Sequence, residues 1–554
     1  MFGTLAKVKH YIRTTYGDSS NAYSCIEVPF QGVYQGNGAG PGIWLLVSIP
    51  IINMLKSAGF GFTVRTVISG DEFSFVCYTF VDDSDVVHSS DGDNDSDTSD
   101  LVAEMQEVVD TWEGGLRASG GALVPTKSYW FLISFIFERN RWRYARLEEC
   151  PGVISIRDID GLSRVELERL DIHEAKETLG VWIAMDGNQH AQTQALIALA
   201  NLWADRVRTG KFSQAEAWYS LQYCIMKSLE YPLMATSMSK KQCDDIMKPI
   251  RSAALSALGS NRHLSLVVVH GPQRYQGMGI PDLWTVQGIL KLWITIQHGD
   301  ALTITGHQLR ASMELHTLEI GLPGNLLQQD YSIYGQLATK SWLKHLWEFC
   351  ADSNIQVTTT TPQLSLARTN DEFLMLQFAS YGYRDTELSQ LNLCRLHCHA
   401  TCLSDITTGD GRRIHPMSWA GYPTESAGRE YEWPTHGRPT NALWTLWQSA
   451  LRQCFLTLET PQQYLRRPLG TWTGPIPAHW HWFYSRSNDR VYHFSPDDNH
   501  YDTYSVLPNR KTLRSPNYFP TTTTTHLPKD CLFYTSDAPH QPHIHTPRRP
   551  HVSQ

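Results

Sequence analysis

The amino-acid sequence predicts an α+β protein in which a strand-rich region is followed by long helical regions. Residues 73–88 read as two short apolar strands around an acidic turn, because Phe, Val, Tyr and Thr favour strands and Asp favours turns. Residues 101–116 place apolar side chains at helical spacing, which predicts a helix that covers a sheet. Residues 190–260 continue in three helical stretches, broken at Gly210 and at Tyr231-Pro232. Segregated strands and helices are typical of the α+β class.

The acidic turn carries two adjacent carboxylates. In Phe80-Val81-Asp82-Asp83, the aspartates directly follow the first strand. Neighbouring carboxylates repel each other, so a hairpin that presents both favours a divalent cation as their partner. Asp82 and Asp83 are therefore candidate metal ligands. The alternative is an ordinary hairpin with a solvated acidic turn.

A glycine-rich segment, Gln31 to Pro41, precedes the hairpin and leads into the apolar stretch Ile43 to Leu55. Its glycines leave room for the backbone to approach a nucleotide or a template strand. The amide of Gln35 can hydrogen-bond to sugar or base edges. The alternative is a flexible loop in front of a buried helix.

Together the two segments resemble conserved blocks of reverse transcriptases. Gly32-Val33-Tyr34-Gln35-Gly36 resembles the second block of that family, and Phe80-Val81-Asp82-Asp83 resembles its two-aspartate hairpin. Three later segments follow the family's order: Gly120 to Lys127 is similar to the next block, Leu179 to Gly187 to the palm-to-thumb segment, and Tyr275 to Leu283 to a signature of non-LTR (LINE-type) retroelement proteins. Five blocks in order are a specific signal, and they cover roughly residues 1–290.

The resemblance implies an RNA-directed DNA polymerase of a retrotransposon, a magnesium-dependent nucleotidyltransferase that uses an RNA template, a DNA primer and deoxynucleotides. In that reaction two metal ions stabilise the attacking and leaving oxygens. Asp82 and Asp83 would hold Mg²⁺, and Lys127 would act as a general acid toward the pyrophosphate leaving group. A surface lysine at a strand start is an equal alternative for Lys127. Tyr34, Gln35 and Gly36 would contact the nucleotide or the template.

One conserved block of the family has no counterpart in this chain. The first catalytic aspartate should lie on a strand well before the Gln-Gly motif, but only thirty residues precede that motif, and Asp18 follows no apolar strand. We therefore expect a palm that is truncated at its N-terminus and has no polymerase activity as the chain stands. Two alternatives remain open: a non-catalytic remnant that binds nucleic acid, and an interaction scaffold.

The charge distribution is uneven. A net charge of −8 is unusual for a protein that must neutralise phosphates. Part of the excess acid lies in residues 89–100, which we expect to form a solvated, disordered loop. Residues 139–146 instead carry four arginines around Trp142 and Tyr144 on an expected hairpin. Arg141 and Arg143 are its candidate nucleic-acid contacts, because arginines bind phosphates and aromatic rings stack on bases; an exposed arginine-rich strand is the alternative.

Composition favours an intracellular protein, in the nucleus or the cytoplasm. Eleven cysteines, an odd number without paired spacing or a secretory N-terminus, indicate a reducing compartment and no secretion. The longest apolar run, Ile43 to Leu55, is shorter than the roughly 20 residues that span a bilayer. We therefore expect no transmembrane segment and no membrane partner. The oligomeric state is left open.

Breaks and composition shifts divide the chain into further regions. We expect a partial palm with the acidic loop, and then a thumb-like helical region in which Trp203, Trp218 and Tyr223 belong to the core. The expected regions are the partial palm (1–188), the thumb-like helices (189–290), a helical continuation (291–357), a mostly helical C-terminal domain (358–460), an aromatic-rich small β unit of two or three strands (461–519) and a disordered tail (520–554).

Three cysteines in the C-terminal domain invite a metal interpretation. Cys394, Cys398 and Cys402 recur every fourth residue, which places them on one face of a helix. Structural zinc sites usually use paired spacings from loops, and no fourth ligand stands at a matching distance. The pattern favours a buried helical face over a zinc site.

Overall fold

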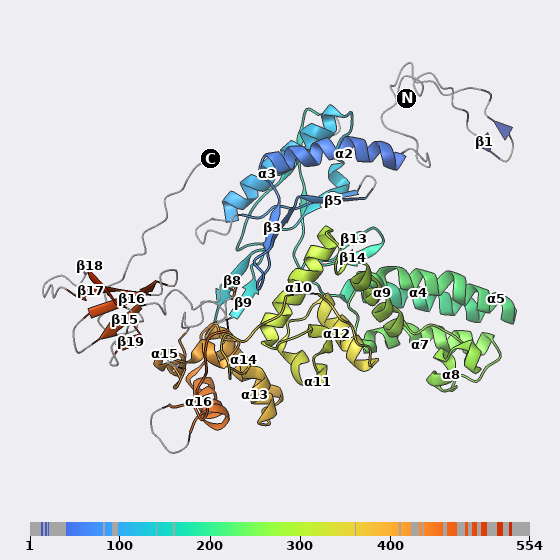
Figure 1. Ribbon diagram of the computed structural model, residues 1–554. Helices are drawn as coiled ribbons and strands as arrows, with labels where there is room; N and C mark the ends of the chain where they lie inside the picture. The colour runs from blue at the N-terminus through green and yellow to red at the C-terminus, as the bar shows by residue number, and fades with distance from the viewer. Residues whose placement is uncertain are drawn as a thin grey trace. The chain divides into compact units, whose positions relative to one another are not determined.

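The computed structural model describes the chain from Gly40 to Thr473 with short gaps at 81–82, 91–97, 140, 159–160, 361, 409–410, 423–430, 435–436 and 458–462, together with residues 11, 13–14, 17–18 and 20 and five strands beyond residue 481. Helices and strands are mixed, and the sheets are small and mostly antiparallel, which agrees with the α+β class (Figure 1). The chain forms two compact units. Unit 1 holds residues 1–64, 72–138 and 142–195, and unit 2 holds residues 65–71, 139–141 and 196–554.

Two helices form the core of unit 1. Helix α2 (Gly40–Ser57) and helix α3 (Thr98–Ala118) lie side by side in Figure 1 and are in contact. The approach is close at Gly115, where an added Cβ would lie 2.9 Å from Ile51 Cγ2. Leu55 and Val108 are fully buried between the helices. The helix predicted over residues 101–116 is confirmed, and it begins at Thr98, within the segment predicted as an acidic loop.

Helix α2 bears on the membrane prediction. It extends from Gly40 to Ser57 and is therefore five residues longer than the apolar run Ile43 to Leu55 on which that prediction was based. In the described part of the chain it is the one helix that is long and apolar enough to cross a membrane. Core helices pass the same test of length and composition. Only 17% of this helix is buried: Ile51 and Leu55 pack against α3, whereas Leu45 and Leu46 are exposed.

The strands of unit 1 pair in twos. The four antiparallel pairs that follow one another are β3 (Phe62–Arg65) with β4 (Glu72–Phe75), β5 (Cys77–Phe80) with β6 (Asp83–Val86), β8 (Phe135–Glu138) with β9 (Arg141–Tyr144), and β10 (Ser155–Arg157) with β11 (Arg164–Glu166). Strands β13 (Lys176–Thr178) and β14 (Val181–Ile183) form another antiparallel pair, and β7 (Tyr129–Trp130) pairs in parallel with β12 (Glu168–Arg169). Each described sheet of this unit therefore has two strands.

Unit 2 begins with the helices that the sequence predicts. Helix α4 (His190–Thr209), helices α5 (Gln214–Tyr219) and α6 (Met226–Glu230), and helix α7 (Lys240–Ala257) occupy the three predicted stretches. Trp203 is buried and Trp218 packs on the core, as predicted. Tyr223 was expected in the core and is 65% exposed, so this prediction is wrong. Its place on a π-helical turn, Ser220–Ile225, changes the helical register by which its face was judged.

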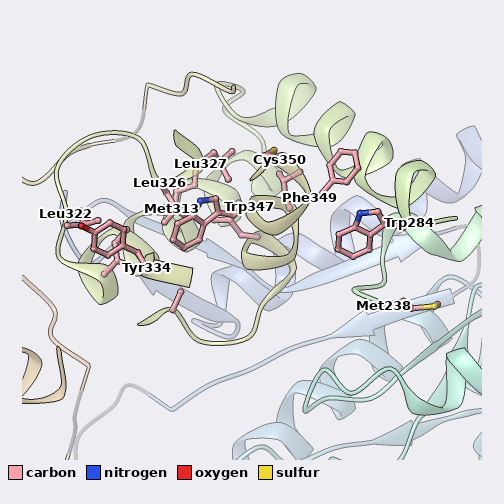
Figure 2. Close-up of a cluster of buried hydrophobic side chains, with 14 of the residues drawn as sticks. Met238, Trp284, Met313, Leu322, Leu326, Leu327, Tyr334, Trp347, Phe349 and Cys350 are labelled. Atoms are coloured by element: carbon pink, nitrogen blue, oxygen red, sulfur yellow. The ribbon is translucent and has the colours of Figure 1, made fainter. Parts of the chain in front are cut away.

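The remaining helices of unit 2 share that core. Its main elements are α9 (Leu283–His298), α10 (Ile304–Ile320), α12 (Trp342–Asp352), α13 (Leu374–Ser380), α14 (Asp385–His397) and α16 (Asn441–Phe455). Figure 2 shows part of it, with Trp284, Trp347 and Phe349 in the hydrophobic cluster. The cluster runs from Leu196 to Leu469, across the expected boundaries at residues 290 and 357.

The C-terminal strands form a larger sheet than expected. Five antiparallel strands follow the order β18 (Tyr518–Thr524), β17 (His500–Val506), β16 (Arg490–Ser495), β15 (Trp482–Ser485), β19 (Cys531–Phe533). The small β unit is confirmed, but with five strands instead of two or three. Strands β18 and β19 take in residues 520–524 and 531–533 of the segment predicted as a disordered tail, because β18 pairs with β17 and β19 pairs with β15. The His- and Pro-rich residues 534–554 lie outside the described residues.

Candidate functional site

The carboxylate hairpin has the predicted form. Strands β5 and β6 pair Phe80 with Asp83 and Tyr78 with Asp85. This register leaves Val81 and Asp82 as a two-residue connection, the shortest common hairpin loop. Both of those residues lie outside the described part of the chain. The apolar strand predicted over residues 73–80 is divided at Val76, because β4 pairs with β3 while β5 pairs with β6.

The base of the hairpin is buried and its tip is exposed. Val76 is 3% exposed and belongs to the same hydrophobic cluster as Leu55 of α2 and Val108 of α3. The Val76 carbonyl accepts a hydrogen bond from Val87 N at 2.8 Å, which continues the ladder beyond β6. Phe80, beside the tip, is 61% exposed. The two helices thus hold the hairpin at its base and leave its acidic end accessible.

A third carboxylate shares the face of Asp83. Asp85 stands two residues further along β6, and side chains two apart in a strand point to the same side. Desolvation raises the pKa of Asp85, and the nearby Asp83 carboxylate raises it further. Asp85 was not among the predicted ligands, although alternation along a strand that starts at Asp83 would place both carboxylates on one face. Two like charges on one face are what a bound cation would stabilise.

The described residues fit a metal only in part. No arginine or lysine among them pairs with Asp83, so this carboxylate is available as a ligand. No group of three or more His, Cys, Asp or Glu side chains with metal-binding geometry occurs in the part of the chain that the structure describes. Asp82 lies outside the described residues. The hairpin therefore offers an accessible pair of carboxylates rather than a complete metal cage.

The local structure around Asp18 does not match the apolar strand on which a first catalytic aspartate would lie. It ends the two-residue strand β2 (Gly17–Asp18), which pairs with β1 (Arg13–Thr14). Both residues of β2 are exposed. The absence of an apolar strand before Asp18, which was noted in the sequence, agrees with this exposed two-residue pairing.

The structure connects neither the glycine motif nor Lys127 with the carboxylate hairpin. Tyr34, Gln35 and Gly36 lie outside the described residues, which resume at Gly40, the first residue of α2. Lys127 ends a short 3-10 helix, Pro125–Lys127, just before β7, and its side chain is exposed. Within the described part of the chain, no hydrogen bond or ion pair joins Lys127 to Asp83. The structure thus leaves Lys127 as a surface residue at a strand start.

The arginine-rich segment forms the expected hairpin, but its two kinds of side chain separate. Strand alternation places Trp142 and Tyr144 on one face of β9 and Arg141 and Arg143 on the other. Arg143 donates to Glu138 at 2.9 Å and to both carboxylate oxygens of Glu149 at 2.7 Å. These hydrogen bonds from Arg143 lower the pKa of Glu149 to about 2. Arg143 is already neutralised, so a phosphate would have to compete with two carboxylates for it.

The cysteine pattern is a packing feature. Cys394, Cys398 and Cys402 are fully buried, the first two in the main core of unit 2. Burial raises the pKa of Cys394 to about 12, which disfavours the thiolate that zinc requires. The cysteines are buried, as expected, but the prediction that they share one helix face is wrong: α14 (Asp385–His397) ends before Cys398, and Cys402 precedes a 3-10 helix, Leu403–Ile406.

Comparison with known proteins adds no relative. No protein-family model matches the chain, and no curated protein matches it at a significant level.

Proposed function

We propose that the chain is a reverse-transcriptase-like retroelement protein whose β5–β6 hairpin holds magnesium and the phosphates of a deoxynucleotide. The observation that supports the proposal is the register of the hairpin, in which Phe80 pairs with Asp83 beyond a base packed on α2 and α3. Asp82 directly precedes Asp83 in the sequence. The order of the five sequence blocks supports the same assignment. RNA-templated DNA synthesis is the reaction that the family performs in its complete form.

Magnesium would supply electrostatic stabilisation of the phosphates during nucleotidyl transfer. Proteins usually bind Mg²⁺ through one or two carboxylates together with substrate phosphates, so Asp82 and Asp83 are enough to dock a metal–nucleotide complex. The two-metal reaction uses more ligands than one pair of aspartates supplies. We therefore propose that residues 1–554 bind the nucleotide through the hairpin and do not extend a primer.

A second candidate function is nucleic-acid binding without chemistry. It is favoured by the exposed aromatic side chains on one face of the β8–β9 hairpin and by Arg141, which is exposed on its other face. Such a remnant would bind nucleic acid in a salt-sensitive way that does not require magnesium.

The two candidates differ in their need for magnesium and for the hairpin carboxylates. The test measures binding of a fluorescent deoxynucleoside triphosphate to the purified chain with and without Mg²⁺. The variant Asp82→Asn/Asp83→Asn removes both hairpin charges. The matched control, Asp95→Asn/Asp97→Asn, removes two charges from the acidic segment 89–100.

The proposed function predicts magnesium-dependent binding that falls at least about tenfold in Asp82→Asn/Asp83→Asn and stays unchanged in the control, because each lost charge-assisted contact is worth roughly 1.5–3 kcal/mol. Nucleotide binding that is equally strong with and without magnesium, or that falls equally in Asp82→Asn/Asp83→Asn and in the control variant, would contradict the proposed function. Salt-sensitive binding of RNA without any magnesium-dependent nucleotide binding would support the second candidate.

A further inference from the structure

An aromatic ladder covers one face of the β8–β9 hairpin. The Phe137 and Trp142 rings lie 5.0 Å apart across the strands, and the Phe135 and Tyr144 rings lie 4.9 Å apart. The rings are tilted against each other by 56° and 32°, respectively. His173 meets the inner end of the ladder edge-on, with its ring 6.0 Å from that of Tyr144. Four rings thus form two cross-strand pairs on a single face.

The ladder is unusually exposed for aromatic side chains. Phe135 is 53% exposed, Phe137 44% and Trp142 49%. Cross-strand aromatic pairs normally stabilise a sheet by packing on a core, and large side chains that gather on a surface mark an interaction site. These rings instead offer their outer faces to a ligand.

The charge around the ladder points to a polyanion. Residues 138–149 contain four arginines and three glutamates, Glu138, Glu148 and Glu149, in a chain whose net charge is −8. Arg143 is neutralised by Glu138 and Glu149, as described above. Arg141, the first residue of β9, and Arg146, two residues beyond its last residue, are exposed. Arg146 stands two residues beyond Tyr144, at the inner end of the ladder, whereas Arg141 lies on the opposite face of β9. An exposed aromatic face with an exposed arginine at its end can bind a single strand, because bases stack on the rings and a phosphate can meet the cation.

We propose that the ladder formed by Phe135, Phe137, Trp142 and Tyr144 binds a single-stranded nucleic acid by base stacking. Side chains two apart along a strand are separated by about 6.6–6.8 Å, so adjacent rings leave room for an inserted base. Stacking needs no particular base, which suits a protein that must hold any template sequence. The proposal rests on the proposed function for the identity of that strand as a template, but the binding itself requires no metal.

The test measures binding of a labelled single-stranded RNA by fluorescence anisotropy, without magnesium, at low and at moderate salt. The variant Phe137→Ala/Trp142→Ala removes the exposed pair at the outer end of the ladder. The matched control is Tyr219→Ala/Tyr223→Ala, which removes a second exposed pair with rings 4.9 Å apart that lies on a helical segment. The conservative variant Trp142→Tyr keeps a ring for stacking and guards against a loss caused by unfolding of the hairpin.

We expect Phe137→Ala/Trp142→Ala to weaken RNA binding by about tenfold or more, because one base–aromatic stack is worth roughly 1–3 kcal/mol. The control variant and Trp142→Tyr should bind the RNA with an affinity within about threefold of that of the wild-type chain, because both keep aromatic rings at positions 137 and 142 available for stacking. Iodouridine placed in the RNA should crosslink to a peptide that contains residues 135–144. Equal binding by the ladder variant and the wild type, or crosslinks confined to other peptides, would overturn the proposal.

Failure of this proposal is distinguishable from failure of the proposed function. Asp82→Asn/Asp83→Asn should abolish magnesium-dependent nucleotide binding and leave metal-free RNA binding unchanged. The ladder variant should show the reverse. A protein that binds nucleotide through the carboxylates but does not bind RNA through the ladder would refute only the present inference.

Discussion

At the residue scale, Lys291 shows how the core accommodates an ionisable side chain. Its side chain on α9 is fully buried. The ammonium group donates to Ser237 Oγ at 2.7 Å and to the Trp342 carbonyl at 3.3 Å, and it lies 4.9 Å from the centre of the Trp342 ring. No carboxylate pairs with it among the described residues. Burial therefore lowers the pKa of Lys291 to about 6.

This shift predicts a pH-dependent stability. Unfolded lysine titrates near 10.5, so between about pH 6 and 10.5 the unfolded chain binds one more proton than the folded chain, and the free energy of unfolding rises with pH. We expect urea unfolding to show a gain of about 2 kcal/mol between about pH 7 and pH 8.5, at roughly 1.4 kcal/mol per pH unit. Lys291→Met should remove this gain. The same increase in both proteins would show that Lys291 is not its source.

The neighbouring histidine does not confuse the measurement. His345 is buried, and desolvation lowers its pKa to about 4, with the nearby Lys291 contributing in the same direction. His345 therefore makes the free energy of unfolding rise with pH between about pH 4 and pH 6.5, and this contribution no longer changes above neutral pH. Above pH 7 the buried thiols of Cys243 and Cys394, whose pKa burial raises to about 12, act in the opposite direction as their unfolded forms begin to ionise. The comparison with Lys291→Met therefore isolates the lysine.

Single residues also show what the sequence could and could not predict. The sequence signal for the hairpin aspartates is local, because four consecutive residues are enough to show two adjacent carboxylates after an apolar strand. The role of Glu314 is not local. Its carboxylate accepts hydrogen bonds from Ile68 N, Ser69 N and Ser69 Oγ at 2.8–2.9 Å, across some 245 residues of chain. No periodicity connects these positions, so sequence reasoning could not pair them.

At the element scale, the packing of α9 on α12 depends on one small residue. Gly288 is buried in the middle of α9, where helix propensity would favour alanine. A Cβ at this position would overlap the ring of Phe349 on α12. The ring is itself buried and cannot move aside without disturbing the core shown in Figure 2.

Gly288→Ala should therefore destabilise unit 2, by about 1–3 kcal/mol of overpacking against a gain of about 1 kcal/mol in helix propensity. The matched control is Gly114→Ala on α3, where an added Cβ meets no atom within 4 Å. The control should be neutral or stabilising by up to about 1 kcal/mol. Urea unfolding of both variants measures the difference, and a stabilised Gly288→Ala would refute the packing argument.

Helices were easier to predict than strands. The pattern over residues 190–260 repeats over many turns, and helices α4 to α7 follow it. The strands of unit 1 are two to four residues long, too short for a period to be established, and several of them were not predicted. The Thr521–Thr525 run was read as low-complexity tail, yet most of it belongs to β18, because pairing with β17 decides its conformation.

At the scale of the whole molecule, the sequence predicted the fold class but divided the helical part too finely. Thumb-like helices, helical continuation and C-terminal domain were expected as separate regions, whereas one hydrophobic cluster connects Leu196 with Leu469. The boundaries were placed at glycine, proline and threonine breaks. Such breaks end helices without ending a core, because a core is defined by contacts between elements that are distant in sequence.

The candidate site shows the same division between local and distant information. The β5–β6 hairpin was predicted because its strands and turn are contiguous. The alternation that separates the aromatic ladder from Arg141 and Arg143 was not predicted, because the segment was read as one stripe without assigning its faces. The strand register supplies that assignment.

The measurement that tests the central claim most directly is primer extension on an RNA template with Mg²⁺. It compares residues 1–554 with a version lengthened upstream by the fingers and by a palm strand that carries the family's first aspartate, and with Asp82→Ala in the longer form. We predict DNA synthesis in the longer form only, abolished by Asp82→Ala, because under the proposed function the hairpin carboxylates would hold the metal ions of the two-metal reaction. Synthesis by residues 1–554 alone, or a longer form whose activity survives Asp82→Ala, would contradict this account.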